Sequence, residues 1–132
     1  MKYVLDTHTW IWWNANPDKL SIDVKELLGN PDRFSEILLS AISPWEFCKL
    51  IEKKRYLISN HPLEWIDQAL KMTKLRLVPL TPAISYRSTS LPGSFHADPA
   101  DQIIVATVME ENAILITKDG LIQNYPHLRT LW

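Results

Sequence analysis

The chain has 132 residues and a formal net charge of −1 at pH 7, which fits one domain, residues 1–132, without a global positive field that would attract nucleic acid. A local basic patch is still compatible with this charge. Cys48 is the only cysteine, so no internal disulfide forms, and no stretch resembles a signal peptide or a membrane span; we therefore expect a cytoplasmic protein.

The first expected element is a short strand that ends at a carboxylate. Residues 3–5, Tyr-Val-Leu, form an unbroken apolar run, which is typical of strands buried on both faces of a parallel sheet. Asp6 then lies at the carboxyl end of this strand, where ligands bind in open α/β sheets. The alternative is that Asp6 or Thr7 only caps the helix that the Trp-Ile-Trp-Trp run at residues 10–13 begins.

The next expected elements are a capped helix over residues 21–28, a buried strand over residues 36–42, and a helix with a strong start signal. In this signal Ser43 is the N-cap, Pro44 is the first helical residue and Glu46 is the third. The helix continues to the Lys-Lys-Arg run at residues 53–55, which suits the helix dipole.

The second half of the chain continues this alternation. We expect helices over residues 62–72, 81–90 and 98–112, and strands over residues 75–80, 113–117 and 127–131. Strands separated by helices predict an α/β fold, with a mainly parallel central sheet of about four to five strands flanked by helices. Right-handed crossovers bring the carboxyl ends of these strands to one edge of the sheet.

Acidic residues recur at this edge, after strands or at helix starts: Asp6, Glu46, Asp98, Asp101 and Asp119. Two like charges about 4 Å apart repel by about 4 kcal/mol at an effective dielectric constant of about 20, so such a cluster needs protons or cations. Carboxylate ligands suit Mg²⁺ or Mn²⁺ rather than Zn²⁺. Each acid also has a structural explanation. Glu46 completes a capping box, Asp119 precedes a glycine in a turn, and the other acids suit helix N-termini.

In order and spacing, segments along the whole chain resemble the PIN-domain ribonucleases, specifically the VapC-type toxins of type II VapBC toxin–antitoxin pairs. The matching segments are Val-Leu-Asp-Thr-His at 4–8, Ser-Pro-Trp-Glu at 43–46, Asp-Pro-Ala-Asp-Gln-Ile-Ile-Val-Ala-Thr at 98–107 and Leu-Ile-Thr-Lys-Asp at 115–119. The resemblance implies a Mg²⁺- or Mn²⁺-dependent endoribonuclease, a homodimer, and a cognate antitoxin that covers the site.

The resemblance also implies roles for single residues. The acidic quartet of the family maps to Asp6, Glu46, Asp101 and Asp119. We expect Asp6 and Asp101 to bind the metal directly, and the other two acids to bind it directly or through water. Asp98 would be an accessory residue, and Thr7 and Thr117 would support the acids.

The helix that carries Glu46 offers a basic patch for the RNA substrate. At helical spacing Lys49 and Lys53 share the face of Glu46, and Lys54 and Arg55 extend the patch. The alternative is that these cations form a solvated helix end.

Three more residues lie near the acids in sequence. Gln102 stands where many relatives carry arginine, so a role of that arginine in holding RNA or an acid is missing or supplied elsewhere. His8 and His96 are candidates to assist catalysis, although a lone histidine is more commonly structural.

Two features bear on partners and on rival functions. The chain has six tryptophans, of which Trp12, Trp13 and Trp132 are candidates for an interface. One rival function is a phosphatase of the haloacid dehalogenase class, which wants a second aspartate where this chain has His8. The others are a PIN nuclease that processes RNA outside a toxin pair, and a non-catalytic module that binds metal or RNA.

Overall fold

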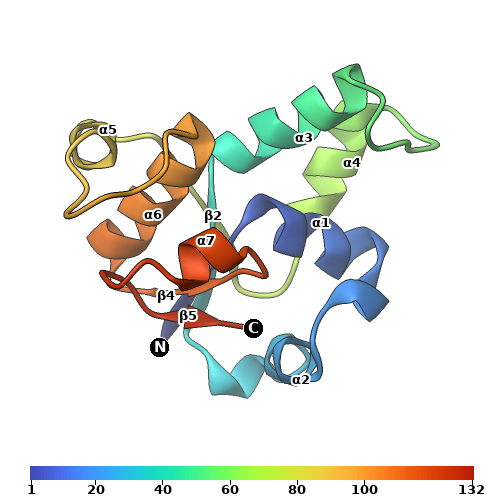
Figure 1. Cartoon of the computed structure of the whole chain (residues 1–132). Coiled ribbons are helices and arrows are strands. Elements are labelled where there is room, and N and C mark those ends of the chain that lie inside the picture. Colours follow the sequence, from blue (N-terminus) through green and yellow to red (C-terminus); the bar gives the residue numbers. More distant parts are fainter.

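A five-stranded sheet lies at the centre of the protein, in a computed structural model that describes residues 1–132 (Figure 1). The strands are β1 (Lys2–Leu5), β2 (Glu36–Ser40), β3 (Leu75–Val78), β4 (Ile114–Ile116) and β5 (Thr130–Leu131). Their order in the sheet is β3-β2-β1-β4-β5, and every neighbouring pair is parallel. The predicted α/β fold with a parallel sheet is therefore confirmed.

Seven helices cover the two faces of the sheet. They are α1 (Thr7–Ala15), α2 (Ile22–Leu28), α3 (Ile42–Glu52), α4 (Pro62–Ala69), α5 (Pro82–Ser88), α6 (Pro99–Glu111) and α7 (Gly120–Gln123). Helices α1 to α4 pack on one face and α5 to α7 on the other, which Figure 1 shows to the right and left of the sheet for most of them. None of these helices is long and apolar enough to cross a bilayer.

The central strand β1 joins the two halves of the core. Because successive side chains of a strand point to opposite faces, Leu5 packs with Trp10 and Phe47, whereas Val4 packs with the residues of α6. Both side chains are fully buried, as the apolar run predicts for a central parallel strand. The end of β1, with Asp6, is thus fixed in the middle of the sheet edge.

Aromatic contacts fix α1 and α3 next to this edge. The indole N–H of Trp10 donates to the carbonyl oxygen of Ala69 at 3.1 Å, and the ring of Phe47 stacks on Trp65 with centroids 4.1 Å apart. Phe47 is fully buried and follows Glu46, so its insertion into the core sets the rotation of α3 and the direction of Glu46.

The predicted capping box at the start of α3 is wrong. Strand β2 ends at Ser40, and the helix begins at once with Ile42, whose N–H donates to the Ser40 hydroxyl at 3.2 Å. Ser43 is therefore the second residue of α3 rather than its cap, and Glu46 is the fifth. With its capping role excluded, Glu46 needs another explanation.

Other element ends also differ from prediction. Helix α1 begins at Thr7 rather than at residue 10, because Asp6 caps it, and the helices and strands of the second half are each two or three residues shorter than predicted. Helix α3 ends at Glu52, where the left-handed backbone of Lys54 (φ 55°) turns the chain. The short helix α7 was not predicted.

Candidate active site

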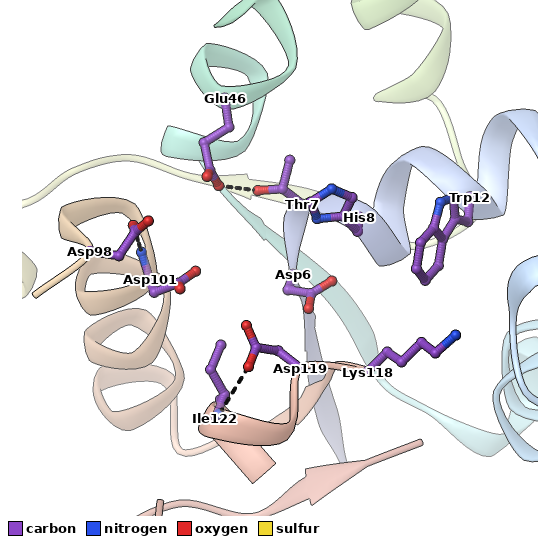
Figure 2. A pocket seen from close by; sticks show the side chains of 10 residues that line it. All are labelled: Asp6, Thr7, His8, Trp12, Glu46, Asp98, Asp101, Lys118, Asp119 and Ile122. Atoms are coloured by element: carbon purple, nitrogen blue, oxygen red, sulfur yellow. Dashed lines mark hydrogen bonds between the residues drawn. The ribbon is translucent and has the colours of Figure 1, made fainter. Parts of the chain in front are cut away.

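Carboxylates from four separate elements gather at the sheet edge around a hollow of about 500 Å³, which we call the acidic hollow (Figure 2). Its lining consists of Asp6, Thr7, His8, Trp12, Glu46, Asp98, Asp101, Lys118, Asp119 and Ile122. All five acids that the sequence singled out line it. They come from the end of β1, from α3, from the start of α6 and from the turn after β4, so the parallel topology brings them together.

Asp6 is held by both of its carboxylate oxygens. The N–H of Thr9 donates to Oδ1 at 2.8 Å, which makes Asp6 the N-cap of α1, and the Thr117 hydroxyl donates to Oδ2. The same Thr117 oxygen accepts the N–H of Asp119 at 3.0 Å. Thr117 therefore connects two acids and sets their spacing, in line with the supporting role that the family resemblance implies.

Glu46 is held by a hydrogen-bond chain that the sequence did not reveal. The Thr7 hydroxyl donates to Glu46 Oε1, and the Thr7 and Ser43 oxygens lie 2.9 Å apart. Because Thr7 has only one hydroxyl proton, Ser43 must donate to Thr7 when Glu46 is ionised. Ser43 is fully buried and acts here as a positioning residue.

The start of α6 orients two more acids. Asp98 is the N-cap and accepts the N–H of Asp101 at 3.0 Å, so Asp101 is the third helical residue, close to the prediction. His96 Nε2 donates to Asp101 Oδ2 at 2.7 Å. The side chain of Gln102 donates to the His96 carbonyl oxygen at 3.0 Å, and the His96 ring stacks on Phe95. Gln102 thus fixes the loop that presents His96 to Asp101.

Burial and mutual repulsion disfavour the charged forms of two acids. Burial, followed by the negative charges of its neighbours Asp101, Asp98 and Asp6, raises the pKa of Glu46 to about 7, against the opposing hydrogen bond from Thr7. Burial also raises the pKa of Asp101, despite its hydrogen bond from His96. The acidic hollow is therefore short of positive charge.

The donor set fits a divalent cation by its chemistry, although no three acidic, histidine or cysteine side chains stand close enough together to enclose one ion in this arrangement. All the acids supply carboxylate oxygens, which hard cations such as Mg²⁺ prefer. Burial, and after it the charges of neighbouring acids, raises the pKa values of Glu46 and Asp101, and a bound cation would favour the charged forms of both.

Sequence reasoning missed one cation beside the acids. Lys118 is the only Lys or Arg that lines the acidic hollow, and its ammonium lies 5.9 Å from the centre of the Trp12 ring. The rings of His8 and Trp132 also contact Trp12, at 5.7 and 6.0 Å between centroids. The position of Lys118, directly before Asp119 at the end of a strand, was the available signal.

The predicted basic patch lies beside the acidic hollow rather than in it. Lys49, Lys53 and Arg55 line a neighbouring hollow, and Lys54 does not. Trp12, Trp13 and Trp132 are all half-buried against the core and leave part of their surface free.

Comparisons with known proteins match nearly the whole length of the chain. The family model of the PIN domain matches residues 3–128. Ribonuclease VapC22 of Mycobacterium tuberculosis is 34% identical over 131 residues, or 98% of this chain and 97% of that protein. Two solved structures share the fold. VapBC2 from Rickettsia felis, bound to a DNA fragment from its promoter, gives a TM-score of 0.69 at 20% identity, covering 99% of this chain and 98% of that chain. A toxin–antitoxin complex from Klebsiella pneumoniae gives a TM-score of 0.65 at 18% identity, covering 98% of this chain and 96% of that chain.

Proposed function

The chain belongs to the PIN-domain family, among its VapC-type ribonucleases, and we propose that it is a Mg²⁺- or Mn²⁺-dependent endoribonuclease that acts as the toxin of a type II toxin–antitoxin pair. The observation that carries this proposal is the gathering of carboxylates from four elements around one hollow that lacks matching positive charge. Membership of the PIN-domain family also argues against the alternative of a phosphatase of the haloacid dehalogenase class.

The acids would hold the metal, with Asp6 and Asp101 as direct ligands and with Glu46 and Asp119 as direct or water-mediated ligands. When bound, a divalent ion supplies a water of lowered pKa and neutralises charge on the phosphate. Thr117 fixes the spacing of Asp6 and Asp119 through its two hydrogen bonds.

In this proposal the other groups in and around the acidic hollow position its acids or contact the substrate. The Thr7 hydroxyl, itself hydrogen-bonded to Ser43, holds Oε1 of Glu46, which leaves Oε2 as the atom where a proton is taken up or released. Lys118, which lines the acidic hollow, would contact a phosphate oxygen next to the acids. Asp98 is an accessory residue that orients the backbone of Asp101.

The basic patch would hold the RNA strand beside the site. Lys53, Lys54 and Arg55 form no ion pair with an acid of this chain, whereas Lys49 pairs with Glu52 at 3.0 Å. Unpaired cations bind phosphates without first giving up an internal partner, so Lys53 and Arg55, which also line the neighbouring hollow, are the better candidates.

The proposal includes two protein partners, a cognate antitoxin and a second copy of the chain. The solved structure from Klebsiella pneumoniae that shares the fold is a toxin–antitoxin complex. The half-buried Trp12, Trp13 and Trp132 offer an aromatic surface next to the acidic hollow, of the kind enriched in protein interfaces. An antitoxin bound there would cover the site.

The first test is cleavage of a mixed cellular RNA pool by the purified chain, with Mg²⁺ or Mn²⁺ and with EDTA. We expect metal-dependent cuts, which Asp6→Asn abolishes, because asparagine keeps the N-cap but removes the charge that holds the ion. Asp67→Asn, at an exposed acid on α4, is the matched control and should cut as the wild type does. Full activity of a folded Asp6→Asn variant would refute the assignment.

The toxin role has a separate test in living cells. Induced expression in a bacterial host should arrest growth with the wild-type chain and with Asp67→Asn, but not with Asp6→Asn. Growth arrest that persists in the Asp6→Asn variant would contradict toxicity through RNA cleavage. Cleavage in vitro without any growth arrest would point to an RNA-processing nuclease outside a toxin pair.

A further inference from the structure

A second hollow of about 500 Å³, which we call the basic hollow, opens beside the acidic hollow and shares four lining residues with it: Thr7, His8, Glu46 and Asp98. The rest of its lining includes the apolar side chains of Trp45 and Leu50. It also includes three cations, Lys49, Lys53 and Arg55. A bound polymer that extended from the acidic hollow into the basic hollow would contact the acids first and the exposed indole of Trp45 next.

Trp45 is unusual among the tryptophans of the chain. Trp45 is 54% exposed, whereas the other five tryptophans are buried or half-buried in the core. The ammonium of Lys49 lies 5.6 Å from the centre of the Trp45 ring, on one of its faces. The indole is thus polarised by a cation and still has surface free for a flat apolar partner.

The end of α3 directs a cation into the same hollow. The N–H of Lys54 donates to the carbonyl oxygen of Ile51 at 3.0 Å, and that of Arg55 donates to Leu50 at 2.9 Å. These two hydrogen bonds, together with the left-handed backbone of Lys54, form a Schellman motif at the end of the helix. It turns the chain back, so Arg55 lines the basic hollow and Lys54, one residue earlier, does not.

An exposed aromatic ring next to unpaired cations is the arrangement that binds single-stranded nucleic acid, in which the base stacks and the phosphate is neutralised. Resting on the ribonuclease function proposed above, we propose that the basic hollow is a nucleotide subsite. A base next to the scissile phosphate stacks on Trp45, while Lys53 and Arg55 contact the backbone. A base inside a duplex has no free face, so this subsite selects single strands, and it tolerates any base.

The test measures binding rather than cleavage. A short labelled oligouridylate is titrated with the wild-type chain in EDTA, so that the proposed chemistry does not affect the readout. We expect Trp45→Ala to raise the Kd about ten-fold, Trp45→Phe to retain most of the affinity, and both variants to leave weak binding to duplex RNA unchanged. Tyr86→Ala, at an aromatic residue of α5 that is 75% exposed and lines neither hollow, is the matched control.

The cations are tested by the salt dependence of the same Kd. Replacing both Lys53 and Arg55 by alanine should reduce the slope of log Kd against log salt by about 0.7 for each phosphate that the variant no longer neutralises, and Lys54→Ala should change it less. Equal slopes for these variants would overturn the role of the cations.

Two results would overturn the role of Trp45. One is wild-type affinity of the Trp45→Ala variant for oligouridylate. The other is a change of its mass in solution, measured by light scattering, which would assign Trp45 to an interface between copies. Absence of RNA cleavage by the wild-type chain with metal would refute the proposed function but leaves this binding readout intact.

Discussion

The raised pKa of Glu46 predicts that this residue destabilises the metal-free protein at alkaline pH. A carboxyl whose pKa rises from 4.5 to about 7 on folding binds its proton more tightly in the folded state. Its contribution to stability is complete below pH 4.5 and is lost as the pH rises through 7. Replacing Glu46 by glutamine removes this pH dependence and keeps an oxygen that accepts the Thr7 hydroxyl.

The size of this change in stability follows from the difference between the two pKa values of Glu46. Each pH unit between the two pKa values corresponds to about 1.4 kcal/mol, which gives an upper limit of about 3 kcal/mol above pH 7. Glu46 is only half-buried, so solvent screening reduces the expected value to about 1–2 kcal/mol. Glu46→Gln should therefore be more stable than the wild type by about 1–2 kcal/mol at pH 8, and equal to it near pH 4.

The assay is denaturant unfolding in EDTA, followed by tryptophan fluorescence at a series of pH values. Glu26→Gln, at an exposed acid in the middle of α2, controls for the loss of one surface charge and should follow the wild type. A stability difference between wild type and Glu46→Gln that does not grow with pH, or that has the opposite sign, would refute the repulsion and burial cost that we assign to Glu46 in the acidic hollow.

Three further predictions concern the residues that position the site. Thr117→Val should lower RNA cleavage more than ten-fold and cost about 1–3 kcal/mol of stability, because Asp6 loses a donor, whereas Thr107→Val, at a buried hydroxyl within α6, should leave cleavage unchanged. Phe47→Ala should cost about 3–5 kcal/mol in denaturant unfolding because the ring is fully buried; a loss below about 1 kcal/mol would contradict its anchoring role. Lys54→Gly should raise the free energy of unfolding by about 0.5–1 kcal/mol by relieving the left-handed backbone, and Lys54→Ala should not.

The sheet and the location of the acids were predictable because their signals are local. An apolar run that ends at Asp6 is enough to identify a buried strand and its end. Asp98 followed by Pro99 marks a helix start, and that start places Asp101 in the first turn. Once the strands are parallel, topology alone brings these positions to one edge, and no knowledge of side-chain contacts is needed.

The contacts within the site were not predictable, because they join residues that are distant in sequence. Ser43 reads as a helix cap from its neighbours, but the hydroxyl of Thr7, 36 residues earlier, engages it instead. The ammonium of Lys118 reaches the ring of Trp12 across the sheet edge. Local capping preferences amount to about 1 kcal/mol, which a buried hydrogen bond with good geometry readily offsets.

The capping explanation and the functional explanation of these acids turn out to be compatible. Asp6, Asp98 and Asp119 each cap a helix with Oδ1, which accepts a backbone N–H. The other oxygen of Asp98 and Asp119 forms no hydrogen bond within the chain, and in Asp6 it accepts only the Thr117 hydroxyl. A cap of this kind fixes the carboxylate through one oxygen, and in Asp98 and Asp119 it leaves the second oxygen without a partner in the chain.

The same reasoning explains helix α7, which has only four residues and whose N-cap is Asp119. An isolated helix of this length is unstable in water. Two contacts stabilise α7: the side chain of Ile122 is buried, and Asp119 accepts hydrogen bonds from the N–H groups of Leu121 and Ile122. Glu46 and Asp101 cap no helix, and burial and neighbouring carboxylates raise both of their pKa values. A cation bound beside Glu46 and Asp101 would offset the cost of keeping both acids charged in the acidic hollow and would therefore stabilise the fold.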